Sequence, residues 1–310
     1  MKTNLDIENF DKIYNLLLSK RMQRNTNIYS RLSSRRRPPE SKLYRRGTII
    51  LAADHTARMN ISVASNKYAL INRKDLLYRI TTLLLSKKID GILVVPDILD
   101  ELLLIDEIIE REFNVTILDD IIIMGSINRG GLAGSIFELD DKVTAYTPRD
   151  ILKLGLDSAK FLLRIDISNY DTAKTIEYAQ SVARECDEYG IPLFLEVFPV
   201  RKEGSDYRII KDPYSIASVV GVAASLGFTS FTKFLKLPYV ENFDIVANAT
   251  TLPIYILGGG TGNAKAFCKE LRSAYESGSN VIGAVVGRNI LYPSDMSPLD
   301  AIECIKSISI

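Results

Sequence analysis

Histidine is almost absent from this chain, and its scarcity argues against several kinds of catalytic site. His55 is the only histidine among the 310 residues, whereas a catalytic zinc site usually recruits two or three. A Ser-His-Asp arrangement would have to be built on this one residue, and the chain has neither a CxxC pair nor an HExxH segment. Zinc hydrolase and zinc aldolase chemistry are therefore disfavoured, and covalent catalysis by a lysine amine gains weight.

Cysteine, net charge and long apolar runs are also scarce. Cys186, Cys268 and Cys304 are isolated thiols without a paired spacing, which predicts a reducing compartment and no disulfide framework. The net charge of +1 gives no general attraction to nucleic acid or membranes. No apolar run approaches the roughly 18 residues that span a bilayer, and residues 1–21 do not read as a signal peptide. We expect a cytoplasmic protein that binds neither nucleic acid nor a membrane.

The chain does contain a repeated alternation of two kinds of segment. Runs rich in Ile, Val and Leu are apolar throughout, as strands buried on both faces of a parallel sheet are. These eight runs span residues 48–53, 91–96, 120–125, 160–166, 192–198, 228–236, 253–259 and 281–287. Amphipathic helical stretches such as 73–88, 171–190 and 263–278 separate them. The repetition predicts an α/β fold, a (β/α)8 barrel forming one domain over residues 47–310. A doubly wound open sheet fits less well, because no GxGxxG follows the first run.

Residues 1–46 precede the predicted barrel as an N-terminal extension. They contain a helical stretch over about 6–20 and a basic stretch, RLSSRRRPPESKLYRR, over 31–46. We expect this extension to pack across the bottom of the barrel with its arginines in solvent. Binding of nucleic acid through the basic stretch is the alternative, but no aromatic residues interleave with the charges and no known module is present.

The sixth run contains two lysines in apolar surroundings, FTKFLKLPYV. Lys233 and Lys236 differ by three positions, so their side chains lie on opposite faces of a strand and only one can enter the barrel. Lys236 lies near the end of the run, where Pro238 closes it, and barrels carry their reactive groups at the carboxyl ends of strands. A lysine in an apolar pocket is pushed toward the neutral amine that attacks carbonyls. The alternative is a rim lysine that reaches water or pairs with a carboxylate.

Other polar residues stand at the ends of predicted strands, where packing does not require them. Asp54 and His55 follow the first run, Arg164 and Asp166 end the fourth, and Glu196 lies in the fifth. Asp54 could transfer protons or cap a turn, and a lone histidine more often has a structural role. Each residue alone is weak evidence, but together they predict a polar cluster at the rim.

Glycines follow the seventh and eighth runs. Gly259 and Gly260 belong to the segment GGGTG, and Gly287 precedes Arg288. Barrels commonly bind phosphate at these two places through backbone N–H groups, and a guanidinium adds a bidentate donor. The long segment after the third run contains Arg129 in a glycine-rich stretch, which could close over a bound anion or be a structural excursion. Its acidic FELDD stretch is expected to form salt bridges rather than bind a cation.

The quoted segments together resemble a known enzyme group. ADHTAR, NRGGLAG, FELDD, LKLP and VVGRNILYP are similar to segments of the class I, Schiff-base aldolases. This group includes archaeal-type fructose-bisphosphate aldolase, deoxyribose-phosphate aldolase and tagatose-bisphosphate aldolase, and the resemblance points to an uncharacterised subgroup over about residues 47–308. LKLP and VVGRNILYP are its most specific parts.

The resemblance implies roles for particular residues. Lys236 would form the imine, and Asp54 would position water or a substrate hydroxyl. Asp166 would transfer protons where archaeal-type members have a tyrosine on the fourth strand, and Arg164 would supply a positive charge beside the lysine. Phosphate would lie against the glycines and the guanidinium that follow the seventh and eighth strands, and the remaining candidate contacts to substrate are His55, Arg129 and Glu196.

We therefore expect a class I aldolase that acts on a phosphorylated sugar or sugar acid, needs neither metal nor cofactor, and assembles as a homo-oligomer as related enzymes do. Two other functions remain open. The first is a metal-free sugar-phosphate isomerase or epimerase, in which Glu196 or Asp166 moves protons and Lys236 only neutralises charge. The second is a barrel that binds a phosphorylated ligand without catalysis.

Overall fold

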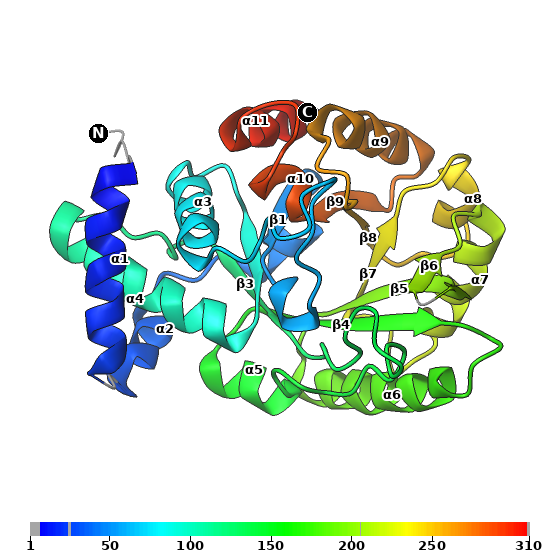
Figure 1. Ribbon diagram of the computed structural model, residues 1–310. Helices are drawn as coiled ribbons and strands as arrows, with labels where there is room; N and C mark the ends of the chain where they lie inside the picture. Colours follow the sequence, from blue (N-terminus) through cyan, green and yellow to red (C-terminus); the bar gives the residue numbers. More distant parts are fainter. Residues whose placement is uncertain (1–6, 24–25, 205, 309–310) are drawn as a thin grey trace.

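The computed structural model describes residues 7–23, 26–204 and 206–308. Its central feature is a ring of parallel strands surrounded by helices (Figure 1). The strands of the ring are β1 (Thr48–Ala52), β2 (Gly91–Val94), β3 (Ile122–Ser126), β4 (Ser158–Ile165), β5 (Leu193–Glu203), β7 (Lys233–Pro238), β8 (Ile254–Leu257) and β9 (Val281–Val286). Pairing runs in the order β4-β3-β2-β1-β9-β8-β7-β5, and β4 also pairs with β5. That last pairing closes the ring, so the predicted (β/α)8 barrel is confirmed and the open sheet is excluded.

Helices follow the strands and cover the outside of the ring (Figure 1). They are α1 (Ile7–Met22), α2 (Ser30–Ser34), α3 (Arg73–Leu85), α4 (Pro96–Phe113), α5 (Pro148–Leu154), α6 (Asp171–Tyr189), α7 (Pro213–Ala224), α8 (Phe243–Ala247), α9 (Ala264–Ser277), α10 (Arg288–Leu291) and α11 (Pro298–Ile308), with 3-10 turns at Thr26–Tyr29, Glu40–Tyr44 and Thr56–Arg58. Local signals set several ends: Asn72 and Asp212 cap α3 and α7 through their side chains, and Gly190 ends α6 in the left-handed region. None of the helices in the described ranges is both long and apolar enough to cross a membrane.

The N-terminal segment packs against the outside and the bottom of the ring. Helix α1 packs on α4 and α3, and Leu43 is buried with the side chains inside the barrel. The hydroxyl of Tyr255 donates a hydrogen bond of 2.6 Å to the carbonyl oxygen of Leu43. The guanidinium of Arg35 is buried and pairs with Asp157, just before β4, at 2.5 Å. The expectation that the arginines of this stretch stand in solvent is therefore wrong for Arg35.

One strand was not predicted. Residues 200–203 extend β5 beyond the ring, and β6 (Asp206–Ile209) pairs with them in an antiparallel hairpin. Each partner is short, and the segment VRKEGSDYRII is rich in charged residues, so it does not read as a buried strand. The sixth run is also shorter than expected: its strand begins at Lys233, because residues 228–232 form a turn.

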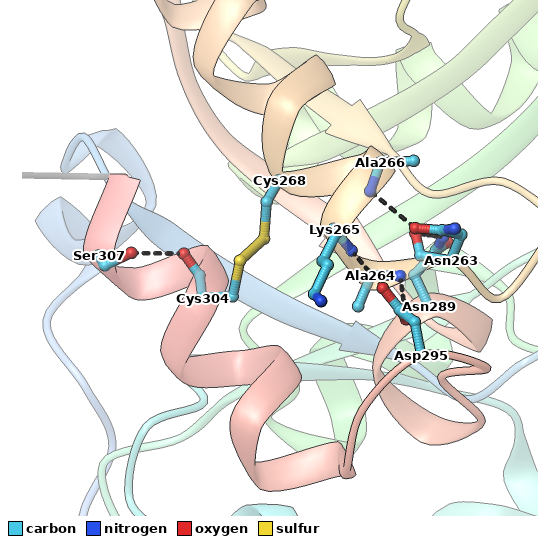
Figure 2. The surroundings of a disulfide bond; sticks show 9 residues. All are labelled: Asn263, Ala264, Lys265, Ala266, Cys268, Asn289, Asp295, Cys304 and Ser307. Carbon is cyan, nitrogen blue, oxygen red and sulfur yellow. Dashed lines mark hydrogen bonds between the residues drawn. A yellow bond between two sulfur atoms is a disulfide. The ribbon is translucent and has the colours of Figure 1, made fainter.

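Two of the three cysteines are joined, contrary to the expectation of free thiols. Cys268 of α9 and Cys304 of α11 form a disulfide with their Cα atoms 6.5 Å apart (Figure 2). The sulfurs meet because these two helices pack side by side, a contact between residues 36 apart that cysteine spacing does not reveal. Cys186 is free and buried. Cysteine usage therefore no longer favours a reducing compartment.

Candidate active site

A cavity of about 350 Å³ opens at the carboxyl ends of the barrel strands. Its walls come from the segments that follow β1, β3, β8 and β9, together with the ends of β4, β5 and β7 and the hairpin of β5 and β6. Ten of the eleven predicted site residues line it: Asp54, His55, Arg129, Arg164, Glu196, Lys236, Gly259, Gly260, Gly287 and Arg288. Residues spread over more than 230 positions are thus gathered in one place, as strand ends in a closed barrel are.

The two lysines of β7 point in opposite directions, as their spacing predicted. Lys236 faces the cavity, and its Nζ lies 2.8 Å from Oε1 of Glu196, which is at the paired position on β5. Lys233 faces the helical layer, where its Nζ lies 3.1 Å from Oδ1 of Asp187 on α6. Lys236 is buried and paired with a carboxylate, and it is also one of the residues that line the cavity.

A third lysine at the site was missed in the sequence. Lys160 of β4 is fully buried, and its Nζ lies 3.0 Å from Oδ2 of Asp54 and 3.4 Å from Oε2 of Glu196. It is not among the residues that line the cavity, so it supports the two carboxylates from inside the barrel. Strand parity could have found it, because Lys160 and Arg164 are four positions apart and share a face. It was overlooked because it stands near the start of its strand, away from the reactive end.

The two carboxylates are ionised although they are buried. Burial alone raises the pKa of Asp54, but the positive charges of Arg129, Lys160 and Lys236 hold that pKa well below its usual range. Burial likewise opposes ionisation of Glu196, and Lys236, Lys160 and Arg129 again lower its pKa. Burial and the neighbouring Arg129 lower the pKa of Lys160 itself. Three cations therefore face two carboxylates in this cluster.

Asp54 uses one of its oxygens for contacts inside the barrel, whereas the other is buried without a hydrogen-bond partner among the described residues. Its Oδ2 pairs with Arg129 and Lys160, and the hydroxyl of Ser126 donates to it over 3.2 Å. Its Oδ1 has no hydrogen-bond partner in the part of the chain that the structure describes. Because Asp54 also lines the cavity, this buried, unpartnered oxygen belongs to the polar wall of the cavity.

His55 is neutral and packs against the glycine that follows β9. Burial lowers the pKa of its imidazole to about 3, with the charges of Arg288 and Arg129 acting in the same direction. A Cβ at Gly287 would lie 2.4 Å from Cε1 of the imidazole and 2.6 Å from the carbonyl oxygen of Ala52. No larger residue fits there, so glycine at 287 is required by close approach. The imidazole is available as a neutral hydrogen-bonding group rather than as a cation.

Arg288 stands beside the other glycine loop without a carboxylate partner. Its Nη1 donates to Oδ1 of Asn60 and to the carbonyl oxygen of Ser62, each over 3.1 Å. No carboxylate lies within ion-pair distance of it in the described ranges, and its buried Nε has no hydrogen-bond partner there. A Cβ at Gly260 would lie 3.0 Å from Nη1, so the loop backbone and the guanidinium adjoin. This is the donor set that an oxyanion needs.

The loop after β3 is fixed by ion pairs. Arg164 lies 2.9 Å from both Glu138 and Asp141, and Arg58 lies 2.7 Å from Glu138. The prediction of salt bridges in the FELDD segment is confirmed. Arg164 is neutralised by these partners, so it does not supply the extra positive charge expected beside Lys236, and Lys160 does so instead. Across residues 7–23, 26–204 and 206–308, no three His, Cys, Asp or Glu side chains are grouped so that they could hold a metal ion.

Asp166 is the one predicted site residue that lies outside the cavity. Strand β4 ends at Ile165, and the carboxylate of Asp166 turns back to accept hydrogen bonds from the backbone N–H of Ser168 at 2.9 Å and from its hydroxyl at 2.7 Å. Such a turn is what an aspartate after a strand commonly forms. The side chain therefore stabilises the start of the loop to α6. The expectation that Asp166 lines the site is wrong, and its proton-transfer role stays a prediction that this geometry does not support.

Most of this chain matches one protein family. Residues 46–306 match the family model described as Cgl0159-like. The chain belongs to the Cgl0159-like family. A crystal structure of Cgl0159 from Corynebacterium glutamicum is 32% identical and has a TM-score of 0.87, with 96% of this chain and 97% of that chain covered.

Members of the predicted aldolase group are related to this Cgl0159-like protein at lower identity. It is 28% identical over 151 residues to 2-amino-3,7-dideoxy-D-threo-hept-6-ulosonate synthase 1 of Archaeoglobus fulgidus, covering 49% of the chain and 53% of the relative. It is 28% identical over 177 residues to tagatose 1,6-diphosphate aldolase of Lactococcus lactis, covering 48% and 54%. The chain thus spans about half the length of the curated relatives it matches.

The fold is also shared with an archaeal fructose-1,6-bisphosphate aldolase, whose structure was solved with its catalytic lysine covalently bound to the carbinolamine intermediate of the substrate. It is 17% identical with a TM-score of 0.55, and 84% of this chain and 92% of that one are covered. These findings confirm the resemblance to the aldolase group that was stated from the sequence.

Proposed function

We propose that this protein is a class I aldolase that cleaves or forms a phosphorylated sugar or sugar acid through an imine on Lys236. The observation that carries the proposal is the position of this lysine: Lys236 lines the cavity, and its Nζ lies 2.8 Å from an ionised carboxylate of Glu196. The covalent lysine of the archaeal fructose-1,6-bisphosphate aldolase supports the same chemistry here. Lys160 is buried below the cavity, so it is not the amine that meets the substrate.

In the first step the neutral amine of Lys236 attacks the carbonyl carbon of a ketone. A C–N bond forms, the carbonyl electron pair moves to oxygen, and the resulting carbinolamine loses water to give a protonated imine. Glu196 is placed to take the proton that leaves the ammonium of Lys236 before the attack and the one that leaves its nitrogen after the C–N bond forms, and to deliver both to the oxygen that departs as water. The buried Lys160, whose Nζ lies 3.4 Å from the same carboxylate, favours the ionised form of Glu196 before each transfer begins.

In the second step the imine accepts the electron pair of the adjacent C–C bond. The bond breaks, an enamine remains on Lys236, and the hydroxyl of the departing half loses its proton and becomes an aldehyde. The free Oδ1 of Asp54 is placed to take that proton. A proton then adds to the enamine carbon. Water hydrolyses the resulting imine and releases the ketone, and this consumes one water molecule, which balances the one released in the first step.

The phosphate of the substrate is proposed to lie between Arg288 and the backbone of the glycine loops. The guanidinium adjoins Gly260 and has no carboxylate partner in the described ranges, and burial lowers its pKa without removing its charge. An anion there would satisfy the buried Nε. Cytoplasmic location and assembly into a homo-oligomer stay predictions.

The test is trapping of the imine. The protein is incubated with dihydroxyacetone phosphate and sodium borohydride, digested, and mapped by mass spectrometry. We expect an adduct on the peptide that contains residues 231–240, none in Lys236→Arg, and full labelling in Lys174→Arg, a conservative change at an exposed lysine of α6. A wild-type protein that turns over sugar phosphates without an adduct on Lys236 would refute the mechanism.

A second function is favoured by one observation, the ion pair between Lys236 and Glu196. In a sugar-phosphate isomerase or epimerase Glu196 would move protons and Lys236 would only neutralise charge. Lys236→Arg distinguishes the two, because an arginine keeps the charge but cannot form an imine. Activity that survives this change supports the isomerase. If phosphorylated ligands stabilise the protein against unfolding but none is turned over, the protein is a barrel that binds such a ligand without catalysis.

A further inference from the structure

The hairpin of β5 and β6 gives the cavity a wall of a different character from its phosphate side. Val200 pairs with Ile209, and these two and Tyr207 line the cavity. The charged residues Arg201 and Arg208 form the alternate pair of the hairpin and are exposed. Phe198, Val200 and Ile209 form one apolar cluster, which also contains Leu139, Leu162, Tyr207 and Leu257.

Apart from Leu257, which precedes the glycine loop after β8, this apolar wall lies across the cavity from the phosphate side. In the ring β9 is four strands away from β4 in either direction, so Arg288 after β9 and Leu162 on β4 are on opposite sides of the barrel mouth. Lys236 stands between the two sides, because β7 pairs with β8 on one edge and with β5 on the other. A substrate bound to this lysine with its phosphate at Arg288 therefore extends its other half toward the hairpin.

Two of the cations near the apolar wall are already neutralised. Arg164 pairs with Glu138 and Asp141, and Arg58 pairs with Glu138. Among the described residues that line the cavity, Lys211 is the one other cation besides Arg288 without a carboxylate within ion-pair distance. Lys211 is exposed and is shared with a neighbouring groove, so it stands at the outer rim.

We propose that the half of the substrate that leaves as an aldehyde is uncharged and aliphatic, so that the enzyme joins a phosphorylated ketone to an unphosphorylated aldehyde. This inference rests on the proposed aldolase function and deepens it. A second phosphate would lose water against Val200, Phe198 and Ile209 without gaining a free cation there, which is costly for a charged group. An alkyl chain would gain contact with the same residues, by about fourfold in affinity for each CH2 fully buried.

The experiment measures aldol synthesis with dihydroxyacetone phosphate as the ketone and a series of aldehydes. We expect kcat/KM to rise from acetaldehyde through propanal to butanal by about fourfold per CH2 at most. We expect glyceraldehyde 3-phosphate to be poorer than butanal by at least about 100-fold. A flat aliphatic series, or a preference for glyceraldehyde 3-phosphate, would overturn the inference.

Variants of the hairpin separate its effect from that of the rest of the cavity. Ile209→Lys places a cation on the wall at a half-buried position, and we expect it to raise kcat/KM for glyceraldehyde 3-phosphate by at least about tenfold and to lower it for butanal. Arg208→Ala, on the exposed face of the same strand, should leave both values unchanged. If the wild type prefers glyceraldehyde 3-phosphate and Lys211→Ala abolishes that preference, the second phosphate binds at the rim and the inference is wrong.

Failure of this inference can be told from failure of the proposed function. Borohydride trapping with dihydroxyacetone phosphate alone tests the lysine and the phosphate side without any aldehyde. If an adduct forms on Lys236 but glyceraldehyde 3-phosphate is preferred over butanal, the aldolase mechanism is supported, whereas the inference of an uncharged, aliphatic aldehyde is wrong. If no adduct forms, both are overturned.

Discussion

Replacing Glu196 by glutamine tests the charge cluster on which the amine of Lys236 depends. The change keeps the shape of the side chain but removes a buried negative charge that lies 2.8 Å from the Nζ of Lys236 and 3.4 Å from that of Lys160. At an effective dielectric constant of about 20, these two contacts correspond to roughly 6 and 5 kcal/mol of attraction. The cost of burying the carboxylate and its repulsion by Asp54 offset much of this.

The net effect follows from what remains after the change. Lys236 loses the carboxylate that it pairs with, and the cluster keeps three cations facing Asp54 alone. Breaking a buried ion pair by removing one partner typically costs about 3–5 kcal/mol. The entropy of unfolding of a chain of 310 residues is roughly 0.65 kcal/mol per kelvin, so Glu196→Gln should lower Tm by about 5–8 °C.

The loss should depend on pH in a defined direction. The pKa of Glu196 is lowered in the folded protein, whereas it is about 4.3 in an unfolded chain. The carboxylate therefore stabilises the fold fully above about pH 4.3, and this stabilisation disappears as pH falls through the lowered pKa of the folded state. The difference in stability between wild type and Glu196→Gln should be constant from about pH 8 to 5.5 and shrink below about pH 4.3.

The assay is denaturant or thermal unfolding of both proteins across this pH range. Glu112→Gln serves as the matched control, because it removes a carboxylate from an exposed pair with Arg111 at 2.8 Å and should cost less than about 1 kcal/mol. A variant as stable as the wild type at pH 7, or a difference that grows as pH falls, would show that Glu196 does not hold the two lysines as described.

Three further changes test other parts of the structure. Arg288→Gln should raise KM for a phosphorylated ketone by at least about tenfold, because a charge-assisted contact is lost, while unfolding stability stays within about 1 kcal/mol; an unchanged KM would remove the guanidinium from the phosphate site. Asp187→Asn should lower the free energy of unfolding by about 3–5 kcal/mol, because Lys233 is left buried without its partner, and a loss below about 1 kcal/mol would contradict that pairing. Gly131→Ala should cost at least about 1–3 kcal/mol, since its Cβ would lie 1.9 Å from the carbonyl oxygen of Glu138; Gly221→Ala, with open space in α7, should be neutral or stabilising, and equal effects of the two would contradict the close approach at 131.

Much of the fold could be read from local patterns in the sequence. Runs that are apolar on both faces identified the eight strands of the ring, and the spacing of Lys233 and Lys236 separated the inward side chain from the outward one. The glycines after β8 and β9 predicted an anion site, because barrels commonly bind phosphate after their seventh and eighth strands. These features depend on alternation along one strand and on the position of a residue within its own βα unit, which the chain sequence contains directly.

The partners of those side chains were decided only when the ring closed. Lys160 lies between Asp54 and Glu196 because strands far apart in the chain bring long side chains together across the barrel, whereas Asp166 turns back onto Ser168 and leaves the cavity. Arg164 meets the acidic loop after β3, and Cys268 meets Cys304 because α9 and α11 pack together. Strand alternation fixes which face a residue takes, but contacts across a barrel depend on the closure of the ring and on side-chain reach, which no local pattern contains.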